Sequence, residues 1–126
     1  MMMAAALALS ALTACDKMTT DFEGKWQLKT IEADGVQTEV DTVWFNFQTS
    51  LFMYQLYEPR NDAYRYAYGL NYFNDEGTEV RLELNDDKLL PQTDWTSRIR
   101  TFAIEEVSRK RLVLKSEGKT YYFNKF

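Results

Sequence analysis

The chain of 126 residues has no histidine, one cysteine, two prolines and five glycines. The absence of histidine excludes catalytic triads and metal sites that depend on imidazole. A single cysteine excludes an intramolecular disulfide, so the fold must be stabilised by burial of apolar side chains. The formal net charge of -4 provides no basic surface, which argues against a nucleic-acid partner. The mean hydropathy of -0.46 excludes an integral membrane protein. No sequence motif predicts a cofactor.

Aromatic residues, in contrast, are abundant, with eight tyrosines, eight phenylalanines and three tryptophans. Such residues favour strands, and runs of alternating polar and apolar residues recur between turn signals. The runs cover residues 24–31, 40–48, 51–57, 64–73, 78–84, 98–107, 111–115 and 119–125. Connections of hairpin length imply antiparallel neighbours. We therefore predict an all-β fold, an eight-stranded antiparallel up-and-down barrel, because closure removes exposed edges. A β-sandwich is the alternative.

The N-terminal segment contains a separate signal. An apolar stretch over residues 4–12 has the length of a signal-peptide core and is too short to span a bilayer. Leu12-Thr13-Ala14-Cys15 follows and resembles the lipobox of bacterial lipoproteins. The resemblance implies a signal peptide over residues 1–14, acylation of Cys15 and a polar tether over residues 15–21. The folded domain then covers residues 22–126. The alternative is a free thiol beside an ordinary apolar segment.

A second resemblance begins at Gly24-Lys25-Trp26 on the first expected strand. A Gly-x-Trp at the start of an eight-stranded meander resembles the lipocalins, and together with the lipobox it resembles lipocalin-like lipoproteins of Bacteroidetes. The resemblance implies a barrel floor formed by Gly24 and Trp26 and an open end that admits a small hydrophobic ligand. Thr93-Asp94-Trp95 is similar to the Thr-Asp-Tyr signature of that family, one connection early. Arg111 is the nearest counterpart of the arginine that caps the tryptophan.

Residue alternation predicts which side chains face the barrel interior. Trp26 faces inward because its neighbours Lys25 and Gln27 prefer water. The same test places these residues inside: Phe45, Phe47, Phe52, Tyr54, Tyr64, Tyr66, Tyr68, Tyr72, Val80, Leu82, Phe102, Ile104, Leu112, Leu114, Tyr121 and Phe123. These rings can fill the lumen as an ordinary core. A buried hydroxyl without a partner costs about 1–3 kcal/mol, however, so the tyrosines favour a wet or ligand-lined cavity.

Two arginines share the alternation of Phe102. Arg98 and Arg100 are therefore expected at one rim of the lumen, where an inward arginine needs a carboxylate partner or an anionic ligand. The alternative is that both reach solvent at the start of their strand. The candidate ligand-binding residues are Phe45, Phe47, Phe52, Tyr54, Tyr64, Tyr66, Tyr68, Arg98, Arg100 and Phe102. No residue is predicted to be catalytic or to bind a metal.

These features predict a membrane-anchored, non-enzymatic barrel in the cell envelope. Its expected ligand is a small, partly apolar molecule, and an inward Arg98 or Arg100 would favour an anionic one. We expect anchoring to the outer membrane in preference to the inner one, with the domain in the periplasm or at the cell surface. The alternative is a protein-interaction module, an inhibitor or accessory subunit, whose loops at residues 58–63 and 85–97 form the contact surface. An open cavity above Trp26 favours the first function, and a packed lumen favours the second.

Overall fold

The computed structural model describes residues 21–126, and the candidate lipidation site at Cys15 lies outside them. The described part contains nine strand segments and one short 3₁₀ helix. In chain order these are β1 (Gly24–Ala33), β2 (Val36–Glu39), β3 (Val43–Gln48), β4 (Leu51–Glu58), β5 (Ala63–Phe73), β6 (Glu79–Leu84), η1 (Leu90–Gln92), β7 (Ile99–Val107), β8 (Arg111–Ser116) and β9 (Lys119–Lys125).

The strands form a closed antiparallel barrel, which confirms the predicted fold class. Each strand from β3 to β9 pairs with the next, and β1 pairs with β9 to complete the ring. Gln27 of β1 pairs with Trp44 of β3, whereas Ala33 pairs with Val36 of β2. Because β9 occupies the other edge of β1 along its length, β2 and β3 are two halves of one interrupted strand. The barrel therefore has eight strands.

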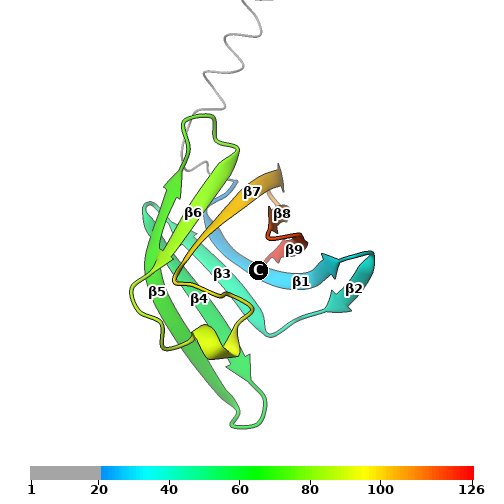
Figure 1. The fold of residues 1–126 in the computed structure, drawn as a ribbon, viewed down its shortest axis with the longest axis vertical. Coiled ribbons are helices and arrows are strands. Elements are labelled where there is room, and N and C mark those ends of the chain that lie inside the picture. The colour runs from blue at the N-terminus through cyan, green and yellow to red at the C-terminus, as the bar shows by residue number, and fades with distance from the viewer. Residues whose placement is uncertain (1–20) are drawn as a thin grey trace, which may run out of the picture.

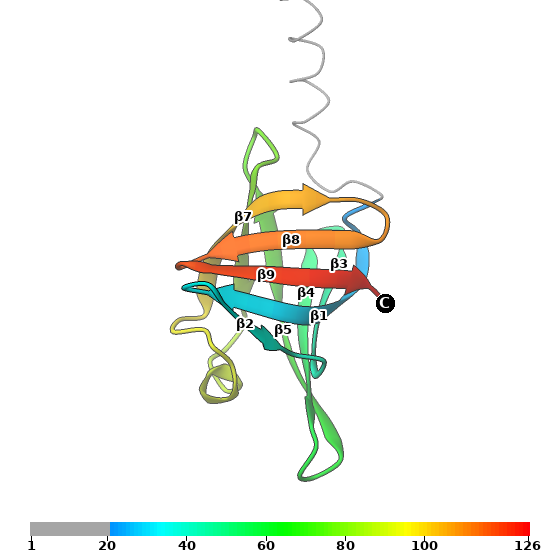
Figure 2. The ribbon, with the colours of Figure 1, turned by 90° about the vertical axis from the view of Figure 1, so that its right-hand side faces the viewer.

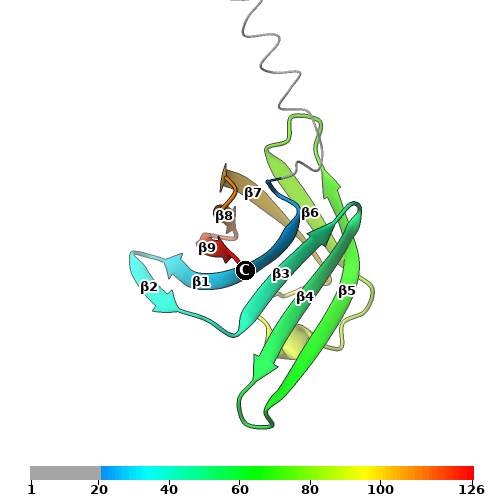
Figure 3. The same cartoon turned by 180° about the vertical axis from the view of Figure 1, so that it is seen from behind.

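The barrel wall has two parts that cross each other. Strands β3 to β6 form one part, and β7, β8, β9 and β1 form the other (Figure 1). After a rotation of 90°, the second part lies in front and its strands run across those of the first (Figure 2). Seen from behind, β1 curves strongly and carries the short β2 away from the barrel (Figure 3). The curvature accompanies a bulge between Leu28 and Thr30, a device that bends strands.

The hairpin turns follow from local sequence. Asp34 and Gly35 have φ angles of 53° and 77°, and Glu117 and Gly118 have 55° and 78°. Two successive residues with positive φ are the requirement of a tight hairpin turn whose twist matches that of the strands. Both turns lie at the end of the barrel that also carries the β6–β7 connection, residues 85–98. We call this end the mouth and the opposite end, where Trp26 lies, the floor.

The interior consists mainly of aromatic and branched side chains, as the alternation of residues predicts. The buried members of the predicted set are 0–4% exposed: Phe45, Phe47, Phe52, Tyr54, Val80, Leu82, Phe102, Leu112, Leu114, Tyr121 and Phe123. Ile104 is half-buried and packs against them. A cavity large enough for water would leave exposed surface on the side chains that line it. The lumen around the buried residues is therefore filled.

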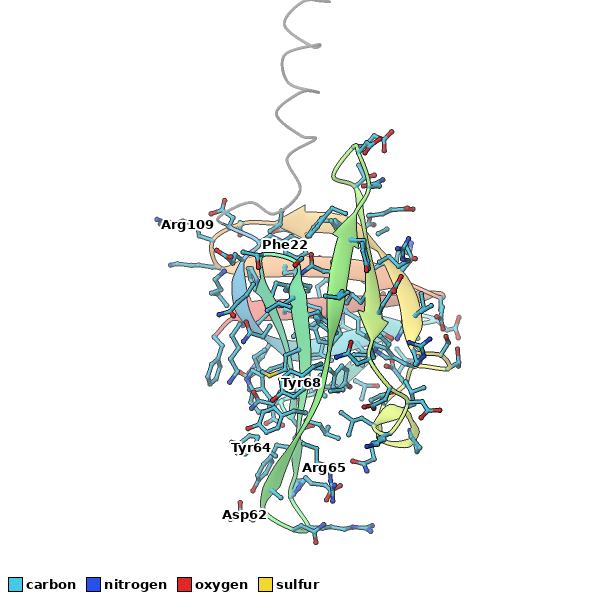
Figure 4. All side chains as sticks on the ribbon, turned by 90° about the vertical axis from the view of Figure 1, so that its left-hand side faces the viewer. Phe22, Asp62, Tyr64, Arg65, Tyr68 and Arg109 are labelled. Atoms are coloured by element: carbon cyan, nitrogen blue, oxygen red, sulfur yellow. The ribbon has the colours of Figure 1, made fainter. Side chains whose placement is uncertain are left out.

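Strand β5 is the exception. Tyr64, Tyr66, Tyr68 and Tyr72 are 40–58% exposed, so their predicted position inside the barrel is wrong. Figure 4 shows Tyr64 and Tyr68 along the outer side of β5. The pairing register explains why, since Tyr54 of β4 lies opposite Ala67 of β5 and partners in register share a face. The buried residues on the interior face of β5 are therefore Ala67, Gly69 and Asn71, and the tyrosines face outward.

Gly69 shows why small residues are needed on this face. It lies opposite Phe52, and a Cβ added to it would be 2.0 Å from the carbonyl oxygen of Glu83 on β6. Arg65, which misled the polarity test, has the inward alternation of Ala67 but is exposed. It pairs with Glu58 at 2.9 Å on the β4–β5 hairpin, which extends beyond the barrel (Figure 1). A side chain on the inward side of the strand at that position, such as that of Arg65, therefore faces solvent.

Candidate ligand site at the barrel mouth

The connection over residues 85–98 covers the mouth and carries a tryptophan into the lumen. After η1, the hydroxyl of Thr93 donates to the carbonyl of Leu90 at 3.0 Å and accepts from the backbone N–H of Trp95, also at 3.0 Å. These two bonds shape the segment locally. The result is that Trp95 is only 4% exposed although it belongs to no strand.

The indole of Trp95 packs among rings of the barrel wall. Its plane lies 9° from that of Phe52 with centroids 6.2 Å apart, and Tyr54 meets it edge-on at 88° and 5.9 Å. Phe45 and Phe102 complete the enclosure at 6.2 and 5.8 Å. Offset and edge-on arrangements at such distances are favourable for aromatic pairs. These four wall rings form a flat slot at the mouth, which we call the aromatic slot. Trp95, from the connection over residues 85–98, fills it.

Arg100 on β7 provides a positive charge beside this slot. Its side chain is 2% exposed. Nε donates to Oγ of Ser116 at 3.1 Å, and Nη2 donates to the hydroxyl of Tyr121 at 2.7 Å. Two carboxylates balance the charge, since Asp94 Oδ1 lies 3.3 Å from Nη1 and Glu117 Oε2 lies 3.4 Å from Nε. Such partners are required because burial penalises an unpaired charge.

Asp94 is the carboxylate that contacts both cations of this arrangement, Arg100 and Lys119. One oxygen, Oδ1, faces Arg100, and the other accepts a hydrogen bond from the hydroxyl of Tyr121 and lies 3.4 Å from Nζ of Lys119. Arg100, Tyr121 and Lys119 all come from the barrel wall, on β7 and β9. Asp94 itself comes from the connection. The wall therefore supplies the two cations and the phenol, and the connection supplies the Asp94 carboxylate that they contact.

Two phenols near this site have raised pKa values. Burial is the main cause for both Tyr54 and Tyr121, and the neighbouring Asp94 carboxylate adds to each shift. The direction means that both hydroxyls keep their protons at neutral pH. Tyr121 can therefore donate to a carboxylate while it accepts from Arg100.

The floor has a different construction. Trp26 is fully buried, and its Nε1 donates to the carbonyl of Phe22 at 2.8 Å. Lys125 places Nζ 4.1 Å from the centre of the indole ring, whereas Arg111 lies over Tyr122 instead. The assignment of Arg111 as the residue that caps the tryptophan is therefore wrong, because the last strand delivers Lys125 to that position. Gly24 has φ of 125° and allows Lys125 to approach, since an added Cβ would lie 3.1 Å from Nζ.

The structure brings together only part of the predicted ligand-binding set. Phe45, Phe52, Tyr54, Phe102 and Arg100 surround the Asp94–Trp95 segment, and Phe47 lies nearer the floor against Phe22. Arg98 is exposed, with its guanidinium donating to the carbonyl of Leu84 at 2.9 Å, so its predicted position in the lumen is wrong. It precedes the first residue of β7, where strand alternation does not yet apply.

Sequence reasoning missed the residues that occupy the mouth. Asp94 and Trp95 were noticed only as part of a family signature, and Ser116 and Lys119 were not singled out. A large aromatic residue inside an otherwise polar connection was the available signal, since an exposed tryptophan is rare without a function.

The outer face of the barrel at β5 forms a second feature. The rings of Tyr66 and Tyr68 lie nearly parallel, 19° apart with centroids at 6.3 Å. Tyr68 borders two shallow clefts, one of 290 Å³ towards Met53 and one of 490 Å³ towards Lys88. This face combines exposed aromatic rings with polar groups, the composition of many protein-contact surfaces.

Within residues 21–126, no group of three or more acidic side chains is arranged to hold a metal ion. None of the helical structure in the same residues is long and apolar enough to cross a membrane.

Comparisons with known proteins agree with this architecture. Residues 10–126 match the family model described as a lipocalin-like domain. A lipocalin-like protein from Bacteroides uniformis has a similar crystal structure, with a TM-score of 0.75, 29% sequence identity, and coverage of 84% of this chain and 99% of that one. An uncharacterised protein from Bacteroides eggerthii is similar at a TM-score of 0.71 and 27% identity, covering 84% and 100% of the two chains. No curated protein matches the sequence.

Proposed function

Because the chain belongs to the lipocalin-like domain family, we propose that it is a non-enzymatic binding protein for a small, partly apolar anion. The ligand binds at the mouth, with its charged group on Arg100 and its apolar part in the aromatic slot. Proteins of this size that bind small molecules use one concave apolar site with a few convergent polar groups, and the mouth has this composition.

The observation that carries the proposal is the origin of the groups around Arg100. The cation is almost fully buried, and the closer of its two carboxylate partners, Asp94, belongs to a connection and not to the barrel wall. A carboxylate on a connection can withdraw and leave the cation, Tyr121 and Lys119 available to another anion.

An anionic fluorescent probe, anilinonaphthalene sulfonate, tests this proposal. Arg100→Gln removes the charge and should weaken probe binding by about tenfold or more, because hydrogen bonds to charged groups contribute about 1.5–3 kcal/mol. Arg98→Gln makes the same change two positions earlier on an exposed side chain and should leave affinity unchanged. Equal affinities for both variants and the wild type, with both variants folded by circular dichroism, would contradict an anion site at Arg100.

We also propose that Cys15 anchors the domain to the cell envelope through acyl chains. The support is the resemblance of residues 12–15 to a lipobox. Two or more chains resist release because each buried methylene contributes about 0.8 kcal/mol. Cys15→Ser should move the protein from the membrane fraction to the soluble fraction of fractionated cells. Persistent membrane association of that variant would disprove the acyl anchor.

A second candidate function, a protein-interaction module, is favoured by the filled lumen and by the exposed tyrosines of β5. Photo-crosslinking in cells distinguishes it from small-molecule binding. A crosslinking amino acid in place of Tyr68 should yield one discrete adduct, whereas the same group at the exposed Lys115 on β8 should yield none. A lack of adducts from Tyr68 leaves the small-molecule function as the better account.

A further inference from the structure

Asp94 and Trp95 are neighbours in the chain, and their side chains occupy the two parts of the mouth. The carboxylate lies at the cationic group of Arg100, Tyr121 and Lys119, and the indole lies in the slot between Phe52 and Tyr54. We propose that this dipeptide is an intramolecular mimic of the ligand, which we call the stand-in, and that the ligand is a small aromatic carboxylate. The inference rests on the proposed function and specifies its ligand class.

The charged half of the stand-in indicates a carboxylate. Asp94 uses both of its oxygens, one towards Nη1 of Arg100 and one towards the hydroxyl of Tyr121 and Nζ of Lys119. A planar group with two equivalent oxygens reproduces these contacts. Two positive charges and one phenolic donor converge there, so a cationic or neutral group in the same place would lose them.

The apolar half indicates a flat ring rather than an alkyl chain. Trp95 lies almost parallel to Phe52 and meets Tyr54 edge-on, and Phe45 and Phe102 approach it from other sides. These relative orientations are specific to aromatic pairs. An acyl chain would fill the same volume without reproducing them.

The filled lumen beyond the slot limits the length of the ligand. Phe45, Phe123 and Trp26 are 0–1% exposed, and the ring centroids of Phe45 and Phe123 are 4.9 Å apart. Close packing of this kind leaves no space into which a long chain can extend. The ligand therefore replaces one indole and one carboxylate, as a small arylalkanoic acid would.

The stand-in also competes with the ligand. A group tethered beside its site has a high effective concentration, so the fraction of molecules with a free mouth is small and the apparent affinity is reduced by that fraction. Weakening the stand-in should therefore strengthen binding of the true ligand class. This behaviour separates a stand-in from a segment that merely builds the site.

Isothermal titration calorimetry with three probes tests the inference: indolepropionate, octanoate and tryptamine. Asp94→Asn keeps the shape of the side chain and removes its charge, and Trp95→Ala empties the slot. Each should bind indolepropionate about tenfold more tightly than the wild type. Asp87→Asn, an exposed carboxylate in the same connection, is the matched control and should bind like the wild type. Octanoate should bind Trp95→Ala about tenfold more weakly than indolepropionate, and tryptamine should not bind.

The outcomes separate the ligand class from the proposed function. If octanoate binds as tightly as indolepropionate, the aromatic class is wrong while the anion-binding function stands. If wild type and Asp94→Asn bind indolepropionate equally, the stand-in is wrong. If neither acid binds Asp94→Asn or Trp95→Ala, and both variants are folded by near-ultraviolet circular dichroism, the inference and the proposed function fail together. Tight binding of tryptamine would also overturn the anionic class.

Discussion

Trp26 and Trp95 lie at opposite ends of the barrel and are almost equally buried, at 0% and 4% exposure. Each has a cation near its ring, Lys125 at 4.1 Å from Trp26 and Arg100 at 5.8 Å from Trp95. The partners of the two cations differ. Nζ of Lys125 donates to the backbone carbonyls of Asp21 and Glu23 at 3.0 and 2.6 Å, whereas Arg100 pairs with carboxylates.

This difference separates the proposed binding site at the mouth from the floor, although both ends have a buried ring and a cation. At the floor, the ring belongs to a strand and the cation is held by main-chain oxygens of residues just before β1. At the mouth, the ring and the nearest carboxylate both belong to residues 85–98. The cation there is paired with side-chain carboxylates, and the proposed ligand would replace the one from Asp94.

The largest expected effect comes from removing the two tryptophans in turn. Trp26→Ala should lower the free energy of unfolding by about 3–5 kcal/mol, because it leaves a cavity walled by strands that cannot collapse. Trp95→Ala should cost less than half as much, since residues 85–98 regain conformational freedom. Urea unfolding followed by circular dichroism measures both. Equal losses would mean that the mouth is as rigid as the floor.

Gly69 tests how closely the backbone of β5 packs against the last residues of β6. Gly69→Ala places a methyl group against the carbonyl of Glu83 and should destabilise the barrel by about 1–3 kcal/mol. Gly35→Ala is the control, since nothing lies within 4 Å of its added Cβ and only its φ of 77° is strained. Urea unfolding should show a larger loss for Gly69→Ala, and a smaller loss would show that β6 moves away easily.

Lys125 sharpens the contrast between the two cations. Lys125→Met removes the charge beside Trp26 and should cost about 1–2 kcal/mol, the range for a partly desolvated cation–π contact. It should leave the affinity for anilinonaphthalene sulfonate unchanged, unlike Arg100→Gln. Fluorescence titration and urea unfolding measure the two effects. Loss of probe binding in Lys125→Met would mean that the anion site lies at the floor and not at the mouth.

The smallest expected effect concerns pH, since the contributions of Tyr54 and Lys125 to stability change with pH in opposite directions. Burial raises the pKa of Tyr54 above its ordinary 10.0, so the unfolded chain loses this proton first and stability falls as the pH rises past 10.0. Burial lowers the pKa of Lys125 below 10.5, so the folded chain loses its proton first and stability rises with pH just below 10.5. Urea unfolding midpoints, measured as the pH is raised through the range around 10.0 and 10.5, should show both contributions.

Phenylalanine at position 54 and methionine at position 125 isolate these two contributions. Tyr54→Phe should remove a fall of at most about 1.4 kcal/mol per pH unit above pH 10. Lys125→Met should remove the smaller rise. If Tyr54→Phe leaves the fall in stability above pH 10 unchanged, another group causes that fall.

The sequence allowed the strands, their closure and most of the interior to be predicted, because alternation is strict wherever both faces of the wall differ in polarity. It failed at β5, where Arg65 faces solvent on a hairpin beyond the barrel and reversed the assignment of Tyr64, Tyr66 and Tyr68. The inward position of Arg100 was predicted correctly, but Arg98 was not, because its strand begins one residue later. Asp94 and Trp95 lie in a connection without periodicity, so no pattern indicates where they point.

The pairing of β1 with β9 has a consequence for synthesis. Of the described strands, β1 at residues 24–33 is made first, and its partner β9 at residues 119–125 is made after all the others. The ring cannot close before β9 has been made, so β1 keeps one free edge until then. Contacts between such distant segments also slow folding. A nascent chain therefore exposes an unpaired strand edge through the synthesis of β2 to β8, up to the appearance of β9.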